Sequence, residues 1–177
     1  MATQRTVPMT PKHSLEVVNI DPGRYKVSSL LPEGHVIGRR RAEDKSYRPK
    51  EIVQLQEDVE LQSHQIWEIE KASEDMELYT IKCGGAIVGA IGDKLFAFLQ
   101  LQDGQKPPIW QIRKAQAQEG YILVNFSDDA LYRGEEGWMI WHNEVDEQII
   151  VRPLVIVPTE PPRFPENQLF RFDPLDY

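Results

Sequence analysis

Short segments in which apolar residues stand two positions apart recur along this chain. Four of them begin with an aromatic residue: Trp67-Glu68-Ile69, Tyr79-Thr80-Ile81, Trp110-Gln111-Ile112 and Tyr121-Ile122-Leu123. A spacing of two is typical of β-strands with one buried face. The connection within each Trp–Tyr pair is short and polar, so we expect the two strands of a pair to be antiparallel neighbours.

The same order of strands returns at a nearly constant interval. The two Trp strands begin 43 residues apart and the two Tyr strands 42 residues apart. An earlier strand at Tyr25 and a last strand at Phe170 extend the series to three units, and each unit opens on a Tyr strand and closes on an aromatic one. Three such units with unequal loops predict an all-β fold, a β-trefoil with three repeats of four strands.

The length of the chain, 177 residues, suits one domain with a sizeable core. Its 13 prolines and 11 glycines separate short apolar runs, which favours many short strands over helices. We therefore predict a single domain over residues 20–177. Residues 1–19 show no clear period and are interpreted as an N-terminal extension.

The charge of the chain limits its partners. A formal net charge of −8 and a pI near 5.1 argue against general binding to nucleic acid or to an anionic membrane. A single cysteine, Cys83, cannot form an internal disulfide, and the first residues lack the apolar run of a signal peptide. We expect a cytoplasmic, monomeric protein.

No arrangement of residues predicts an enzyme, a metal site or a cofactor site. The four histidines are dispersed, no glycine-rich phosphate loop is present, and Cys83 has no recognisable catalytic partner. One motif, Gln65-Ile66-Trp67, resembles the Gln-x-Trp signature of ricin-type sugar-binding proteins. It does not repeat in the other two units, so a β-trefoil lectin stays only as an alternative.

The 39–50 loop, from Arg39 to Lys50, is the longest charged stretch of the chain. It follows a short apolar segment that ends at Gly38 and precedes the apolar strand that begins at Ile52. Such a composition predicts an exposed loop, and exposed loops on a rigid frame often carry function.

Several segments together are similar to the mushroom β-trefoil serine protease inhibitors of the cospin family, over about residues 20–172. The segments that carry the resemblance are Tyr25-Lys26-Val27, Val36-Ile37-Gly38-Arg39, Ala42-Glu43-Asp44-Lys45-Ser46, Pro49-Lys50-Glu51-Ile52-Val53, Ile66-Trp67-Glu68-Ile69, Leu95-Phe96-Ala97, Trp110-Gln111-Ile112, Gly137-Trp138, Ile150-Val151-Arg152-Pro153-Leu154, Glu160-Pro161-Pro162 and Leu169-Phe170. The resemblance implies a β-trefoil of the Kunitz-STI-like type. The resemblance implies a cytoplasmic fungal protein that blocks trypsin-like serine proteases in defence against animals.

The resemblance also implies where the target protease binds. In that family the inhibitory loop joins the second and third strands of the first unit, which here is the 39–50 loop. Matching the motif residue by residue gives Lys45 as the primary specificity residue, a scissile bond before Ser46, and Asp44 and Glu43 on its other side.

Two features leave the assignment open. Arg40 and Arg41 depart from the related pattern, and either could occupy the specificity pocket instead of Lys45. Some related fungal proteins inhibit cysteine proteases through other loops, so a cysteine protease inhibitor is a further alternative.

Overall fold

The computed structural model describes residues 20–56, 60–74, 77–126 and 134–175. The predicted N-terminal extension, 1–19, lies outside the described residues. Where the structure is described, no helix is long and apolar enough to cross a membrane.

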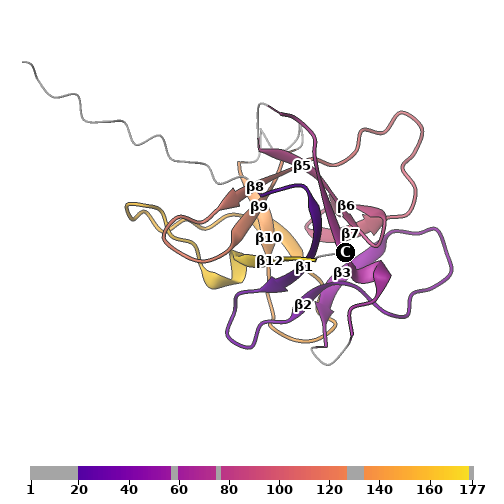
Figure 1. Cartoon of the computed structure of the whole chain (residues 1–177), viewed down its shortest axis with the longest axis horizontal. Helices are drawn as coiled ribbons and strands as arrows, with labels where there is room; N and C mark the ends of the chain where they lie inside the picture. The colour runs from indigo at the N-terminus through magenta and orange to yellow at the C-terminus, as the bar shows by residue number, and fades with distance from the viewer. Residues whose placement is uncertain (1–19, 57–59, 75–76, 127–133, 176–177) are drawn as a thin grey trace, which may run out of the picture.

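Short antiparallel strands make up almost all of the regular structure (Figure 1). The strands are β1 (Gly23–Ser29), β2 (Val36–Arg39), β3 (Lys50–Leu55), β4 (Trp67–Lys71), β5 (Leu78–Cys83), β6 (Ala86–Ile91), β7 (Lys94–Phe98), β8 (Trp110–Lys114), β9 (Tyr121–Asn125), β10 (Glu136–Met139), β11 (Ile150–Pro153) and β12 (Phe170–Pro174). Two single 3-10 turns, η1 (Ser63–Gln65) and η2 (Glu166–Gln168), precede β4 and β12.

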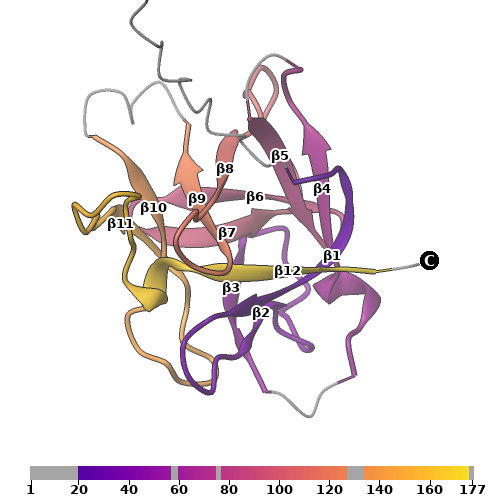
Figure 2. The same ribbon diagram turned by 60° about the vertical axis from the view of Figure 1, so that its left-hand side comes forward.

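The sheet closes on itself through strands β1, β4, β5, β8, β9 and β12. Each of these pairs with two others, and the pairing returns from β12 to β1, which Figure 2 shows lying side by side. The remaining strands form the hairpins β2–β3, β6–β7 and β10–β11. The predicted strand pairs β4–β5 and β8–β9 are both confirmed.

The predicted fold class, a β-trefoil with three repeats of four strands, is corrected to a closed antiparallel β-barrel. All strands belong to one continuous 12-stranded sheet and not to three separate units. Strand β7 of the second unit pairs with β3 of the first and with β11 of the third. The period in the sequence shows that similar strands recur along the chain. It does not show which strands are hydrogen-bonded to each other in the sheet.

The core of the barrel is aromatic, as the pattern of the sequence predicts. Trp67, Trp110, Trp138 and Phe170 are completely buried, and the other three rings each contact that of Trp138 directly. The ring centroids of Trp67, Trp110 and Phe170 lie 5.3, 5.8 and 5.6 Å from that of Trp138. Tilted and edge-on contacts at these distances add to the apolar area that the rings bury.

Two of the core tryptophans also form hydrogen bonds to the hairpins β2–β3 and β6–β7. The indole N–H of Trp67 donates to the carbonyl of Ile37 in β2 at 2.8 Å, and that of Trp110 donates to the carbonyl of Val88 in β6 at 2.9 Å. Most buried indole N–H groups in proteins have such a partner. The hairpin that carries the 39–50 loop is therefore bonded directly to the aromatic core.

Candidate functional site

The 39–50 loop closes the β2–β3 hairpin, and a buried charged residue stands at each end of it. Arg39 ends β2 and Lys50 begins β3, and their side chains are only 8% and 5% exposed. Lys50 lies two positions before Ile52 and so faces the interior with it, because successive side chains of a strand alternate between faces. The residues between the two ends are exposed, except the half-buried Arg40 and Glu43.

Arg39 ties the start of the loop to neighbouring parts of the barrel. Its guanidinium donates to both carboxylate oxygens of Glu43, at 3.0 and 2.5 Å, and to the carbonyls of Cys83 and Gly84 at 3.4 and 3.3 Å. The side-chain amide of Gln65 donates to the carbonyl of Arg39 at 3.1 Å. A buried charge is stable only when it is paired in this way, and the bond to Glu43 raises the pKa of Arg39.

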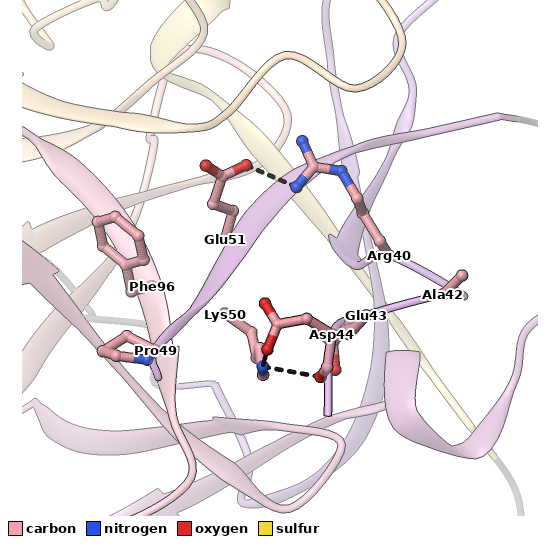
Figure 3. Close-up of a pocket in the computed structure, with 8 residues that line it drawn as sticks. All are labelled: Arg40, Ala42, Glu43, Asp44, Pro49, Lys50, Glu51 and Phe96. Carbon is pink, nitrogen blue, oxygen red and sulfur yellow. Dashed lines mark hydrogen bonds and ion pairs between the residues drawn. The ribbon is translucent and has the colours of Figure 1, made fainter. Parts of the chain in front are cut away.

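The side chain of Lys50 contacts the middle of the 39–50 loop, where its ammonium lies beside the Asp44 carboxylate (Figure 3). Its ammonium lies 3.0 Å from the carbonyl oxygen of Asp44, 2.7 Å from Asp44 Oδ1 and 3.4 Å from Ser46 Oγ. Asp44 Oδ1 also accepts the backbone N–H of Ser46 at 2.8 Å and the Ser46 hydroxyl. The bond to Lys50, followed by those to Ser46, holds the pKa of Asp44 well below its usual range.

The three cationic candidates of the loop differ in how they are engaged. Arg40 donates to Glu51 Oε2 at 2.6 Å and to the carbonyl of Asp146 at 3.3 Å. Lys45 and Arg41 are exposed, and neither side chain has a hydrogen bond or an ion pair within the described part of the chain. Two of the three cations are therefore available to a partner, and one is already paired.

A cavity of about 250 Å³ lies between the loop and strands β3 and β7. Its lining residues are Arg40, Ala42, Glu43, Asp44, Pro49, Lys50, Glu51 and Phe96 (Figure 3). The charged groups around it already pair with each other, Arg40 with Glu51 on one side and Asp44 with Lys50 on the other. This arrangement supports the loop and offers no unpaired group to a small ligand.

The structure brings four of the six predicted site residues into polar contacts: Arg40, Glu43, Asp44 and Ser46. Arg39 and Lys50 are absent from the predicted site residues, although both lie inside the predicted loop. Two signals were available: Glu43 follows Arg39 at a spacing of four, and Lys50 shares the period of two with Ile52 and Gln54.

The motif that suggested a lectin serves the interior. Gln65 and Trp67 are 1% and 0% exposed. The Gln65 amide is bonded to the main chain of Arg39 and Gln62, and the Trp67 indole to that of Ile37. Neither side chain is available to a sugar, so this motif gives the lectin alternative no support.

The chain has counterparts among known proteins. A family model described as Peptidase inhibitor I66 matches residues 18–174. A serine protease inhibitor from Lentinula edodes is 34% identical over 161 residues, which cover 89% of this chain and 100% of that protein. A solved proteinase inhibitor from Coprinopsis cinerea has a TM-score of 0.73 and 35% identity, over 89% of this chain and 100% of that one.

These matches confirm the resemblance to mushroom protease inhibitors. The relatives are named as inhibitors and not as enzymes, in agreement with the sequence prediction. The family model covers nearly the whole of the predicted domain and includes the 39–50 loop. The chain therefore belongs to the peptidase inhibitor I66 family.

Proposed function

We propose that this protein inhibits trypsin-like serine proteases through the 39–50 loop, with Lys45 in the specificity pocket of the protease and the Lys45–Ser46 bond in the scissile position. Membership in a family of peptidase inhibitors supports the general class of activity. The relative from Lentinula edodes, which is named as a serine protease inhibitor, supports the class of target.

The observation that carries the proposal is a free cation between two fixed neighbours. Lys45 is exposed, and its side chain has no hydrogen bond or ion pair among the described residues. Asp44 before it and Ser46 after it are bonded to each other and to Lys50. Trypsin has an acidic group at the base of its specificity pocket, which binds a projecting lysine or arginine. Lys45 can enter such a pocket without breaking a contact of its own.

The rival cations are less well prepared for this role. Arg40 would have to give up its bonds to Glu51 and Asp146 before it could enter a pocket. Arg41 has no side-chain partner among the residues that the structure describes, but its neighbour Ala42 has no polar side chain that could hold the backbone on that side. These differences favour Lys45 and leave Arg41 as the stronger of the two rivals.

The contacts that Arg39 and Lys50 make with the loop explain how the loop could inhibit a protease instead of being its substrate. Contacts from Arg39 and Lys50 order the loop when the protein folds, so less conformational entropy is lost on binding. A protease–inhibitor interface buries roughly 800 Å² on each partner. The exposed residues of the loop and those near it are a suitable source of that area.

The test is a set of inhibition constants for wild-type protein and three charge reversals, Lys45→Glu, Arg41→Glu and Arg40→Glu. We expect Lys45→Glu to abolish trypsin inhibition and the other two to weaken it modestly. Assays with chymotrypsin, subtilisin and papain establish the target class, because inhibition of papain alone would favour the cysteine protease alternative. Full trypsin inhibition by all three variants would remove this loop from the function.

A further inference from the structure

We propose that Lys50 is a positioning residue that holds both sides of the Lys45–Ser46 peptide bond, so that a protease which opens this bond closes it again more often than it releases cleaved inhibitor. The inference rests on the proposed function, because it takes that bond as the one that the protease attacks. It adds a role for a buried residue that would not touch the protease.

The geometry places one ammonium across the bond. On the acyl side Lys50 Nζ donates to the carbonyl oxygen and to Oδ1 of Asp44, at 3.0 and 2.7 Å. On the amine side it lies 3.4 Å from Ser46 Oγ. Lys45 stands between these two points, and its side chain makes no polar contact in the part of the chain that the structure describes. Lys50 therefore fixes the two neighbours of Lys45 and does not engage Lys45 itself.

Asp44 also connects the two sides of the Lys45–Ser46 bond. Its Oδ1 accepts the backbone N–H of Ser46 at 2.8 Å. This nitrogen is the atom that would leave Lys45 if the bond were opened. The carboxylate stays ionised at neutral pH, since the bond from Lys50 holds the pKa of Asp44 well below its usual range.

The chemistry shows why this arrangement matters. The serine oxygen of the protease adds to the carbonyl carbon of Lys45, the C–N bond breaks, and the Ser46 nitrogen takes up a proton and becomes an amine. The ester then has two fates. The amine can attack it, which restores the peptide bond and returns the hydroxyl of the protease, or one water molecule can attack it, which leaves a carboxylate on Lys45.

The choice between these fates depends on where the amine stays. An amine held next to the ester reacts as part of the same molecule, with a large effective concentration. Lys50 can hold it because its own backbone is in β3, where it pairs with Ala97 of β7, and not in the part of the loop that is cut. The Lys50 side chain is 5% exposed and keeps its place on the barrel when the bond opens.

The experiment compares Lys50→Met with wild-type protein during incubation with a catalytic amount of trypsin. Mass spectrometry follows cleavage between Lys45 and Ser46, and inhibition constants are measured in parallel. We expect cleavage to become about 10- to 100-fold faster, the range that follows from loss of a hydrogen bond to a charged group. Methionine keeps most of the buried stem and removes only the ammonium.

Lys114→Met is the matched control. Lys114 also braces a loop from a strand, through the carbonyls of Gln118 and Gly120 at 3.3 Å, but that loop joins β8 to β9. Cleavage of this variant should remain at the wild-type rate. Equal acceleration in both lysine variants would overturn the proposal, because it would reflect general loosening of the barrel.

A second variant covers the case in which Lys50→Met does not fold. Asp44→Asn removes the charged partner of Lys50 without touching β3, and it should also accelerate cleavage. Wild-type cleavage rates in folded Lys50→Met, or in Asp44→Asn, would overturn the role of Lys50. Loss of inhibition in Lys45→Glu together with such rates would leave the proposed function intact, whereas full inhibition by Lys45→Glu would mean that the proposed function itself fails.

Discussion

The aromatic core and the 39–50 loop meet at β2 and β3, yet they use their side chains in opposite ways. In the core, Trp67, Trp110 and Trp138 are completely buried, and the rings of Trp67 and Trp110 both contact that of Trp138. In the loop, buried Arg39 and Lys50 hold the backbone, while Lys45 is exposed and has no side-chain partner among the described residues. The core makes the barrel stable, and the loop presents a side chain that contributes nothing to that stability.

This difference indicates that stability and target choice can be changed separately. A free side chain on a braced loop can be replaced with little effect on folding, whereas a core ring cannot. The residues between the two regions, Arg39 and Glu43, connect them and should affect both properties.

Lys45→Leu should change the target without changing stability. Removal of a central anchoring residue typically costs about 4 kcal/mol or more of binding free energy, so we expect trypsin inhibition to fall by about a thousandfold or more. The unfolding free energy should change by less than about 0.5 kcal/mol. Inhibition assays with trypsin and chymotrypsin, together with thermal unfolding, provide the measurement. A gain of chymotrypsin inhibition would show that the residue at position 45 sets the target while the rest of the protein only presents the loop.

Trp110→Ala should have the reverse effect. The side chain is completely buried and contacts Trp138, so its removal should cost about 3–5 kcal/mol of unfolding free energy. The inhibition constant for trypsin should stay close to that of wild type at temperatures where the variant is folded. Trp67→Ala serves as the comparison, since Trp67 also bonds to β2 and could disturb the loop. A cost below about 1 kcal/mol would contradict the role of Trp110 in the core.

Glu43→Ala should weaken both properties because it leaves the buried Arg39 without its carboxylate. A hydrogen bond to a charged group contributes about 1.5–3 kcal/mol, and we expect an unfolding free energy lower by an amount in that range. Trypsin inhibition should fall as the start of the loop loses its anchor. Denaturant unfolding and inhibition constants measure the two effects, and a change in only one of them would mean that the core and the loop are not connected through this pair.

Acid should affect the loop only under strongly acidic conditions. The folded-state pKa of Asp44 is lowered from 3.8, so the stabilisation from its ionised form is present above that value and is lost as the pH falls through the lower, folded-state pKa. The difference in melting temperature between wild type and Asp44→Asn should therefore be constant from about pH 8 to pH 5. A difference that shrank near neutral pH would show that Lys50 and Ser46 do not hold this carboxylate.

Reducing agents should have the smallest effect. Cys83 is a buried free thiol, and burial raises its pKa to about 12. Dithiothreitol should leave the melting temperature and trypsin inhibition unchanged, and a thiol reagent at pH 8 should label Cys83 only after unfolding. Rapid labelling of the native protein, followed by mass spectrometry, would contradict the burial of this part of β5.

The sequence by itself determined which segments are strands, which of their side chains face inward, and which loop is charged and exposed. Each of these properties depends on local alternation and composition, which can be read from neighbouring residues. The family resemblance pointed to the same loop. The expected cytoplasmic location, the monomeric state and the role in defence stay predictions.

Only the tertiary structure decided how the strands close and which cations are free. The predicted β-trefoil of separate repeats gave way to one closed barrel, because hydrogen bonds between strands far apart in the chain leave no mark on the local period. Arg40 and Lys45 look alike in the sequence, but Arg40 pairs with Glu51 and Asp146, while Lys45 has no side-chain partner in the described ranges of the chain. In the sequence, Lys50 is one more charged residue of the loop. Its role in holding the loop depends on the position of β3, which brings the Lys50 ammonium into contact with Asp44 and Ser46.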